Sequence, residues 1–575
     1  MKTKLKYFLA TAALLSLLAG CSSGKGGDTK ESGDQAKDAS GNKNYTAFIA
    51  VPGTEVPDDS RLNEAFAKEF GWKVKVSWLT GQTAKERIGV MISGGDYPDV
   101  VDASEGRSAM IDAGAYVPLE DYLDDYPNLK GMLSDIDWEK IKKDNDGHIY
   151  TIPQFSAEKV KDMETEYGGE AFWIQKRVLA WANYPEITTL DEYFDLINSF
   201  LAANPETDGQ KNIGFEILSD DWRYFCLENP PQFLAGYPND GAAVVDPETK
   251  VAKVYDKLPE AKEYYQALSA QFEKGVIDPE TFTAKYDQYI AKVSSGRVVG
   301  LIDQGWDFQS AEDSLVSQGK DELTYVPFDL VLDKNVTPQY GEHKSLTTQG
   351  GIGVTVDCKD VKGALQMFDD MVSEKGMILR NWGEKDVDYQ IDGDGKFSRT
   401  DEQWKNWRNT DYVNKNSTAF GYMPGYGGML PDGINTVSPA QQPEEFKKTL
   451  VDSDKAILEA YGVDNWNQMI KKQDPVQPWF PIYTERGKWT SKDEAAIANQ
   501  NMQDVKMQWL PKVIMGGPDA FEKNWQDYMD TYESRINYKA FEDALTDEVA
   551  RRIKVEAELQ EVVDKTESTK ESSSK

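Results

Sequence analysis

The sequence predicts an α/β protein with more than one hydrophobic core. Apolar stretches that end in turns alternate with stretches of helical spacing, giving strands at 45–51, 74–78 and 99–101 and helices at 62–70 and 84–93. This order is typical of a doubly wound parallel sheet, whose ligand site lies beyond the carboxyl ends of its strands. The 575 residues also exceed the roughly 250–300 that one core usually organises.

The middle of the chain continues the alternation of helices and strands. Thr189 lies three residues before Glu192, which is the spacing of a capping box, so a helix is expected at 190–203. Further expected elements are a helix at 261–275, strands at 297–302 and 352–356, and a helix at 361–373. Residues 376–500 are rich in Gly, Pro and Trp and are expected to form loops, with helices returning from residue 501.

Composition excludes several classes of function. With 64 basic and 98 acidic residues the formal net charge is −34, so the body lacks the basic face that nucleic acid or anionic lipid requires. The two histidines, His148 and His343, lie among polar and glycine residues and are expected in turns, leaving little for a zinc site or a His-based triad. Phosphate-loop, dinucleotide and Gly-x-Ser-x-Gly motifs are missing, so no cofactor is expected. Fifteen tryptophans suit a neutral, polar, ring-shaped ligand.

The first 20 residues have the pattern of a secretory signal. Three lysines precede a largely apolar stretch that ends at Ala19 and is too short to span a bilayer. The sequence Leu-Ala-Gly-Cys that ends at Cys21 resembles a bacterial lipobox, which implies cleavage before Cys21 and a lipid on its sulfur. Residues 21–44 are rich in Gly, Ser, Lys and Asp and are expected to form a flexible tether, and 561–575 a disordered tail.

Several segments together carry a family resemblance. In chain order they lie at 93–100 (Ser-Gly-Gly-Asp-Tyr-Pro-Asp-Val), 114–123, 146–153, 189–194, 274–279 and 295–300, followed by 382–389 and 517–525. Their order and spacing resemble the family 1 extracellular solute-binding lipoproteins of carbohydrate ABC importers, in particular the long LplA-like lipoproteins of Gram-positive bacteria. The resemblance covers nearly all of residues 45–550.

The resemblance implies a periplasmic-binding-protein-like fold, in which two doubly wound α/β lobes joined by hinge strands close on a sugar without catalysis. It places lobe 1 at 45–155 plus about 306–375, and lobe 2 at 156–305 plus about 376–560. The implied partners are an oligosaccharide and the ABC permease subunits that receive it from a monomeric protein, lipid-anchored outside a Gram-positive-like cell membrane. The long 376–500 region, which is able to extend or cap the cleft, favours an oligosaccharide over a monosaccharide.

Candidate sugar-binding residues are aromatic rings and polar side chains in expected loops. Trp306 follows the strand at 297–302, at a place where the family often carries a stacking aromatic ring. Trp222 and Arg223 lie among polar neighbours, and the guanidinium of Arg223 is able to fork to paired hydroxyls or to an acidic sugar. The other candidates are Asp96, Gln154, Trp382, Glu384 and Tyr426. The alternative for each is a structural role, such as a core tryptophan or a turn aspartate.

Residues 204–212 resemble the first part of a calcium-binding loop. Oxygen-bearing side chains stand at loop positions 1, 3, 5 and 9, and glycine stands at position 6. The candidate ligands are Asn204, Glu206, Asp208, Gln210 and Asn212. Because Phe215 occupies the place of the usual position-12 glutamate, a plain polar turn is the preferred interpretation, with a structural calcium ion as the alternative.

Two other functions compete with solute binding. A cell-surface glycoside hydrolase would also use tryptophans and a pair of carboxylates, and 98 acidic residues leave room for such a pair. A carbohydrate sensor or adhesin outside transport would share the same fold.

Overall fold

The computed structural model describes residues 35–573 except 54–55, 156, 161–162, 242, 342–345 and 472. The predicted signal, Cys21, most of the predicted tether and His343 lie outside the described residues. The tether was predicted too long, since Lys37 already pairs with Lys43 and the Asn44 amide donates to the carbonyl of Ala36 at 2.9 Å. Among the described residues, no helix combines the length and the hydropathy needed to cross a membrane.

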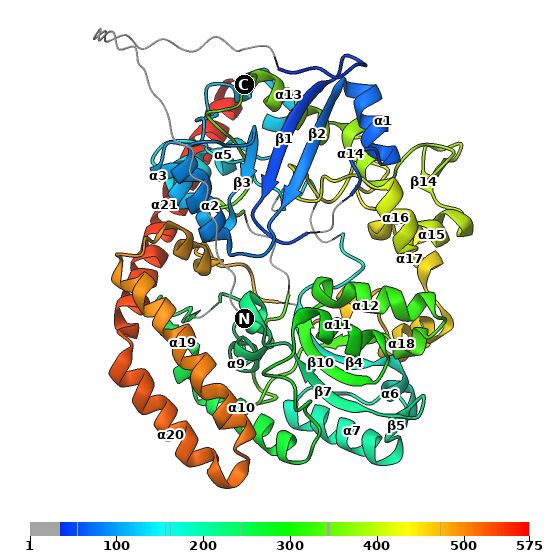
Figure 1. The fold of residues 1–575 in the computed structure, drawn as a ribbon, viewed down its shortest axis with the longest axis vertical. Coiled ribbons are helices and arrows are strands. Elements are labelled where there is room, and N and C mark those ends of the chain that lie inside the picture. Colours follow the sequence, from blue (N-terminus) through cyan, green and yellow to red (C-terminus); the bar gives the residue numbers. More distant parts are fainter. Residues whose placement is uncertain are drawn as a thin grey trace, which may run out of the picture.

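The first lobe contains the predicted parallel sheet. Its strand order is β12-β3-β1-β2, with β1 parallel to β2 and β3, and with β12 antiparallel at the edge. The bounds are β1 Lys43–Ile49, α1 Arg61–Phe70, β2 Trp72–Trp78, α2 Ala84–Gly94, β3 Val100–Asp102 and β12 Gly353–Val354. The β-α-β-α-β order is therefore confirmed, and the carboxyl ends of β1 and β2 point toward the second lobe (Figure 1).

The second lobe is built on a mixed sheet of order β11-β4-β10-β7. Its strands are β4 Glu170–Gln175, β7 Ile213–Ile217, β10 Val298–Gln304 and β11 Tyr325–Phe328. Strands β7 and β10 are parallel, but β4 runs antiparallel to both β10 and β11. The second sheet is therefore mixed, because β4 and β11 carry the chain into and out of the lobe.

Helices cover both sheets and form most of the remaining chain. Around lobe 1 they are α3 Arg107–Asp112, α4 Pro127–Lys130, α5 Asp135–Asp144, α13 Val361–Val372, α14 Glu374–Asn381, α15 Asp401–Trp407, α16 Thr410–Asn416 and α17 Pro443–Thr449. Around lobe 2 they are α6 Lys176–Trp181, α7 Leu190–Ala203, α8 Phe225–Glu228, α9 Pro230–Leu234, α10 Pro259–Glu273, α11 Tyr286–Ser294, α12 Gly305–Ser317 and α18 Asp452–Tyr461. Short hairpins are β5 Glu206–Thr207 with β6 Gln210–Lys211, β8 Ala243–Val245 with β9 Ala252–Val254, and β13 Gln390–Ile391 with β14 Phe397–Ser398.

Two hydrophobic cores define where the chain passes between the lobes. The lobe 1 core draws on residues up to 157 and again on 352–437, and the lobe 2 core draws on 167–340 and 457–549. The predicted crossings at about 306 and 376 are therefore wrong. Phe308 of α12 is buried in lobe 2, and Phe420 of the region predicted as lobe 2 is buried in lobe 1. The second crossing from lobe 2 to lobe 1 follows β11, the strand that pairs with β4, and lies between Tyr340 and Ile352.

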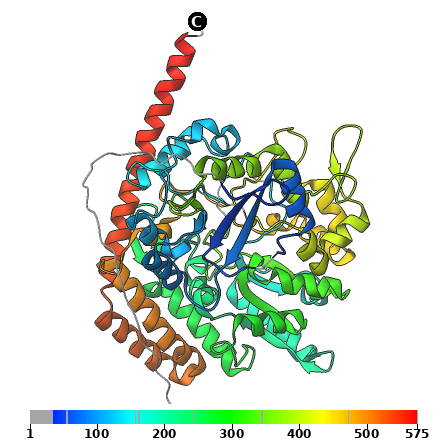
Figure 2. The same ribbon diagram turned by 45° about the horizontal axis from the view of Figure 1, so that its top comes forward.

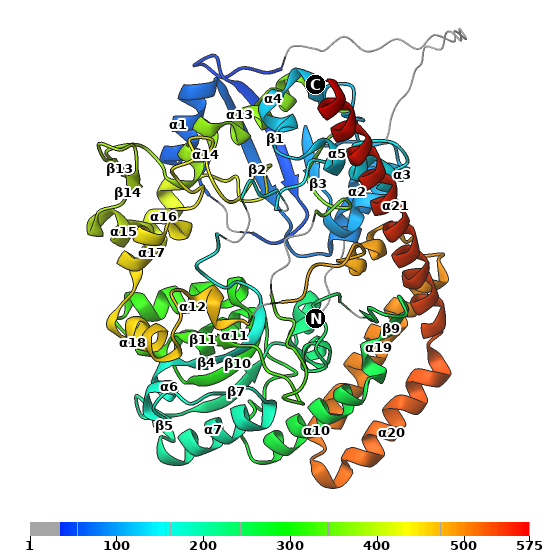
Figure 3. The same ribbon diagram turned by 180° about the vertical axis from the view of Figure 1, so that it is seen from behind.

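Three C-terminal helices complete the structure: α19 Glu494–Met515, α20 Pro518–Arg535 and α21 Tyr538–Ser573. Helix α19 packs on α10, and α21 passes along lobe 2 and reaches lobe 1 (Figures 2 and 3). The middle of α21 is joined to α5 of lobe 1 by two ion pairs. Arg551 pairs with Asp144 at 2.5 Å, and Glu556 pairs with Lys140 at 2.7 Å. The backbone is helical to Ser573, where we predicted a disordered tail, because the helix continues straight from the turns that pack on both lobes.

We expect Arg551→Ala to lower the free energy of unfolding by about 1–2 kcal/mol, because it removes charged hydrogen bonds to Asp144 and Glu548. Denaturant unfolding measures this change. Lys554→Ala on the same helix is the control, since Lys554 is largely exposed and lies 3.8 Å from Glu558. Equal stability of the two variants would contradict a linking role for Arg551.

Candidate functional site

A pair of tryptophans lies at the edge of the lobe 2 sheet. Trp306 is the second residue of α12, directly after β10, and Trp222 follows β7. Because β7 and β10 are parallel neighbours, their carboxyl ends bring both residues to the same edge. The two rings stack with centroids 6.0 Å apart and planes 7° apart. Trp306 is 50% exposed and Trp222 is 46% exposed, so the pair presents a flat apolar surface to solvent.

The tryptophan pair is held by a cation and its acidic partner. Arg223 lies 4.3 Å from the ring centre of Trp222 and 3.7 Å from that of Tyr286. Its Nε donates to both carboxylate oxygens of Asp307, at 2.8 and 2.9 Å. The indole N–H of Trp306 donates to the side-chain oxygen of Gln304 at 2.6 Å. These contacts fix the orientation of both rings before any ligand arrives.

The acids behind this pair are buried and bonded within the protein. Asp303 is fully buried and accepts from the hydroxyl of Tyr289 at 2.7 Å and from the thiol of Cys226 at 3.2 Å. Burial and the neighbouring Asp307 raise the pKa of Asp303. Asp307 is 2% exposed and paired with Arg223. Neither carboxylate is therefore placed to act on a substrate that rests on the tryptophans.

Aromatic side chains of lobe 1 form a cluster at the first crossing. The exposed ring of Phe155 contacts Tyr422 edge to face at 5.1 Å, and Tyr422 contacts Trp78 in the same way at 5.5 Å. Burial and Asp102 raise the pKa of the Tyr422 hydroxyl, and the charge of Arg223 lowers it. Arg223 belongs to lobe 2 and Tyr422 to lobe 1, so the charge of one lobe acts on an aromatic ring of the other.

Gln154 and Tyr426, both predicted as site residues, meet at an open cavity of about 450 Å³ under the first crossing. Gln154 donates to Asp102 at 2.9 Å and to the carbonyl of Tyr422 at 2.6 Å. Arg380 of α14 also lines the cavity. Sequence analysis missed Arg380 and Asp102, although Asp102 ends a strand that it predicted.

Three other candidates lie outside the cleft. Trp382 is fully buried and donates to the carbonyl of Thr436 at 2.9 Å, so it is a core residue. Glu384 pairs with Arg61 at 2.5 Å within lobe 1. Asp96 is exposed and precedes β3, which places it at the amino edge of the sheet, opposite the ligand edge. The prediction placed Asp96 at the approach to this strand, where it does lie, but that approach is away from the cleft.

The predicted calcium loop forms the β5–β6 hairpin, which contains or flanks all five candidates: Asn204, Glu206, Asp208, Gln210 and Asn212. The carboxylate of Asp208 forms an ion pair with the ammonium of Lys320 at 2.9 Å. The side-chain oxygen of Asn212 accepts a hydrogen bond from the hydroxyl of Thr207 at 2.6 Å. Across the described residues, no group of three or more His, Cys, Asp or Glu side chains is placed to hold a metal ion. As arranged, two of the five candidate ligands, Asp208 and Asn212, are bonded to other side chains of the protein.

Added calcium is accordingly expected to leave the thermal unfolding midpoint unchanged, since Asp208 and Asn212 are engaged by protein donors. Scanning calorimetry with calcium and with a chelator measures this. A calcium-dependent rise that Asp208→Ala abolishes would contradict the polar-turn interpretation.

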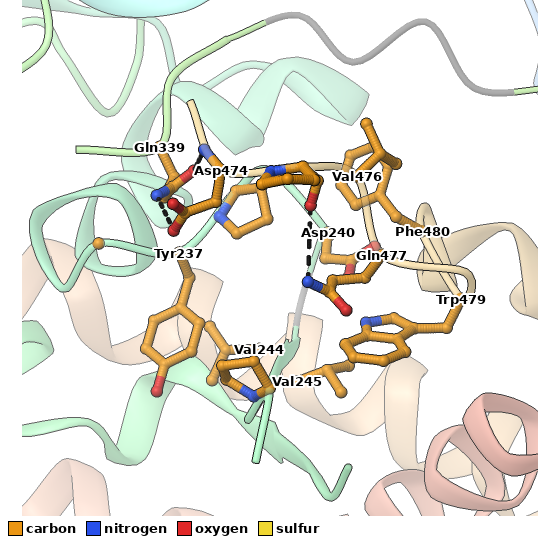
Figure 4. Close-up of a pocket in the computed structure, with 14 residues that line it drawn as sticks. Tyr237, Asp240, Val244, Val245, Gln339, Asp474, Val476, Gln477, Trp479 and Phe480 are labelled. Atoms are coloured by element: carbon orange, nitrogen blue, oxygen red, sulfur yellow. Dashed lines mark hydrogen bonds between the residues drawn. The ribbon is translucent and has the colours of Figure 1, made fainter. Parts of the chain in front are cut away.

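A second cavity, of about 620 Å³, lies in lobe 2. Figure 4 shows the indole of Trp479 opposite Val244 and Val245, with Gln339 and Asp474 joined by hydrogen bonds at the far wall. Asp240 in its wall is buried and accepts from the amide of Ile482 at 2.5 Å. Its lining is mostly apolar, so it offers few polar partners to a sugar.

Comparison with known proteins places the chain in a family. Residues 62–378, more than half of the chain, match the family described as bacterial extracellular solute-binding protein. The lipoprotein LipO of Bacillus subtilis (strain 168) is 25% identical over 419 residues, covering 70% of this chain and 76% of LipO. The polygalacturonan/rhamnogalacturonan-binding protein YtcQ of the same organism is 21% identical over 438 residues, 71% of this chain and 78% of YtcQ.

A solved structure supports the fold. The fructooligosaccharide ABC transporter substrate-binding protein FusA of Streptococcus pneumoniae, solved in complex with kestose, superposes with a TM-score of 0.63 at 17% identity. The match covers 90% of this chain and all of that chain. With the family match over residues 62–378, the two-lobe fold and the aromatic cleft, the chain belongs to the bacterial extracellular solute-binding proteins.

Proposed function

We propose that this protein captures an oligosaccharide between its lobes and delivers it to an ABC permease. The observation that carries the proposal is the stacked, half-exposed pair Trp222 and Trp306 at the carboxyl ends of β7 and β10. Flat aromatic rings pack against the apolar faces of sugar rings, while Arg223 offers donors and the side-chain oxygen of Gln154 offers an acceptor to sugar hydroxyls. FusA, solved with kestose, supports an oligosaccharide as the ligand class.

Closure of the lobes supplies the signal to the permease. A ligand that contacts both lobes stabilises the closed state in proportion to its extra affinity for that state. We also propose that a lipid on Cys21 holds the protein at the outer face of the membrane, where it works as a monomer. Neither calcium nor another cofactor takes part.

The proposal excludes catalysis. The acids nearest the tryptophan pair, Asp303 and Asp307, are buried and bonded, which disfavours the glycoside hydrolase alternative. Calorimetry against a panel of oligosaccharides, with a parallel assay for new reducing ends, tests both parts. Binding without turnover is expected, and steady release of reducing ends would overturn the proposal. Sugar uptake that persists after deletion of the gene would favour the sensor alternative.

A further inference from the structure

The cavity under the first crossing contains a guanidinium without an acidic partner. Arg380 is only partly exposed, and its Nη1 donates to the carbonyl oxygens of Pro424 at 2.9 Å and Met423 at 3.5 Å. Among the described residues, no carboxylate pairs with it. Burial alone lowers the pKa of Arg380 to about 10. A desolvated guanidinium is usually balanced by an anion, because an uncompensated charge in a low dielectric is unfavourable.

A second polar group in the same cavity also has no partner. Tyr426 is 5% exposed, and its buried hydroxyl has no hydrogen-bond partner among the described residues. Buried hydroxyls nearly always bond to protein, water or ligand. The ammonium of Lys159 lies 3.9 Å from the centre of the Tyr426 ring and adds a second positive charge beside the cavity. Its neighbouring carboxylate is Glu374, which does not pair with Arg380.

The loop that forms the cavity wall is shaped for close approach to Arg380. A Cβ at Gly425 would lie 2.9 Å from Nη1 of Arg380. Gly428 adopts a φ of +83°, and a Cβ there would lie 2.5 Å from the carbonyl oxygen of Val160. Glycine at position 425 lets the main chain pack against the cation, and glycine at position 428 lets it pack against the main chain of Val160.

The cavity adjoins the cleft. Gln154 and Phe155 line it, and both also contact Tyr422, an aromatic residue of lobe 1. A chain of sugar rings that rests on Trp222 and Trp306 therefore has a neighbouring place for a further unit.

We propose that this cavity is a subsite for a carboxylate-bearing sugar unit, held by the guanidinium of Arg380. The inference rests on the proposed function and names the ligand class more narrowly, as an oligosaccharide that contains a uronic acid. Guanidinium and carboxylate match as paired donors and acceptors. The net charge of −34 disfavours acidic ligands in general, so an acidic sugar needs a local positive charge in order to bind. The printed name of YtcQ, a polygalacturonan-binding relative, agrees with this class.

The test compares trigalacturonate with its methyl ester, which has the same rings but no charge. Titration calorimetry is expected to show the acid binding about tenfold tighter or better. In Arg380→Gln we expect the acid and the ester to bind with equal affinity. Arg408→Gln, at an exposed arginine of lobe 1, is the matched control and should keep the difference. Arg380→Lys retains the positive charge but loses the paired donors of the guanidinium, so it should keep part of the difference in affinity between acid and ester.

The outcomes distinguish a failure of the proposed subsite from a failure of the proposed function, oligosaccharide capture. If neutral oligosaccharides bind and the acid does not bind more tightly than the ester, the subsite is wrong and the proposed function stands. If Arg380→Gln melts at the wild-type temperature yet keeps the preference for the acid, the subsite is also wrong. If no saccharide of either kind binds, the proposed function itself fails.

Discussion

Replacing Trp306 by alanine is expected to weaken oligosaccharide binding by about 1–3 kcal/mol, roughly a 5- to 150-fold loss of affinity. The substitution removes half of a stacked pair whose planes lie within 7° of each other. Trp222 would remain, but without the neighbour that extends its surface. Because a sugar ring on the pair covers both indoles, Trp222→Ala is expected to have an effect of similar size, and the double variant should bind least.

Calorimetry with the tightest neutral oligosaccharide measures this loss. Trp181→Ala is the matched control, since Trp181 is 46% exposed, lies in the same lobe and packs on Phe200 outside the cleft. It should bind as the wild type does. Unchanged affinity in Trp306→Ala would remove the tryptophan pair from the ligand site.

Stability is expected to fall as the pH rises from about 5 to 7. Burial raises the pKa of Asp240 to about 7 and raises the pKa of Asp303, while the pKa values of Glu170 and Glu216 are well above the usual range. A folded-state pKa above the unfolded value means that the folded state binds more protons in this interval. The stabilisation is complete below the unfolded pKa near 4 and is lost as pH rises through the folded pKa. For Asp240 alone this amounts to about 3–4 kcal/mol.

Acids whose pKa is lowered in the folded state affect stability in a separate, more acidic pH range. Hydrogen bonds to Lys334 and to Arg551 help hold the pKa of Glu192 and Glu548 at about 2 against burial, so their contributions are lost only as pH falls below about 4.5. The greatest stability is therefore expected near pH 5.

Thermal unfolding between pH 4.5 and 8 measures the dependence. Asp240→Asn should reduce the slope between pH 5 and 7, because an amide does not titrate. Asp452→Asn, at a fully exposed aspartate, is the control and should retain the slope. A midpoint that rises from pH 5 to 7 would show that these carboxylates titrate normally.

Local patterns allowed part of the fold and site to be predicted. The period-2 strands and the helices between them placed β1, β2 and β3, and Trp306 was predicted from its position four residues after an apolar strand. Pairing between distant segments was not visible: β4 and β11 are joined through residues about 150 apart in the chain, and this antiparallel pairing sets the second crossing.

The errors at single residues have the same origin. Trp382 and Arg380 lie two residues apart near the end of α14, and only the packing of the 423–436 segment decides that the indole is buried and the guanidinium lines a cavity. Asp96 and Asp102 flank the same strand, and only its direction in the sheet decides which one reaches the cleft.

Titration calorimetry of the chain without its first 20 residues, against neutral and acidic oligosaccharides, tests solute capture most directly. We expect at least one saccharide to bind with a stoichiometry of one and with micromolar affinity or better, and Trp222→Ala/Trp306→Ala to lose most of that affinity. No reducing ends should accumulate. Absence of any saccharide binding at millimolar concentration, together with binding of a peptide or a lipid, would contradict the proposed function.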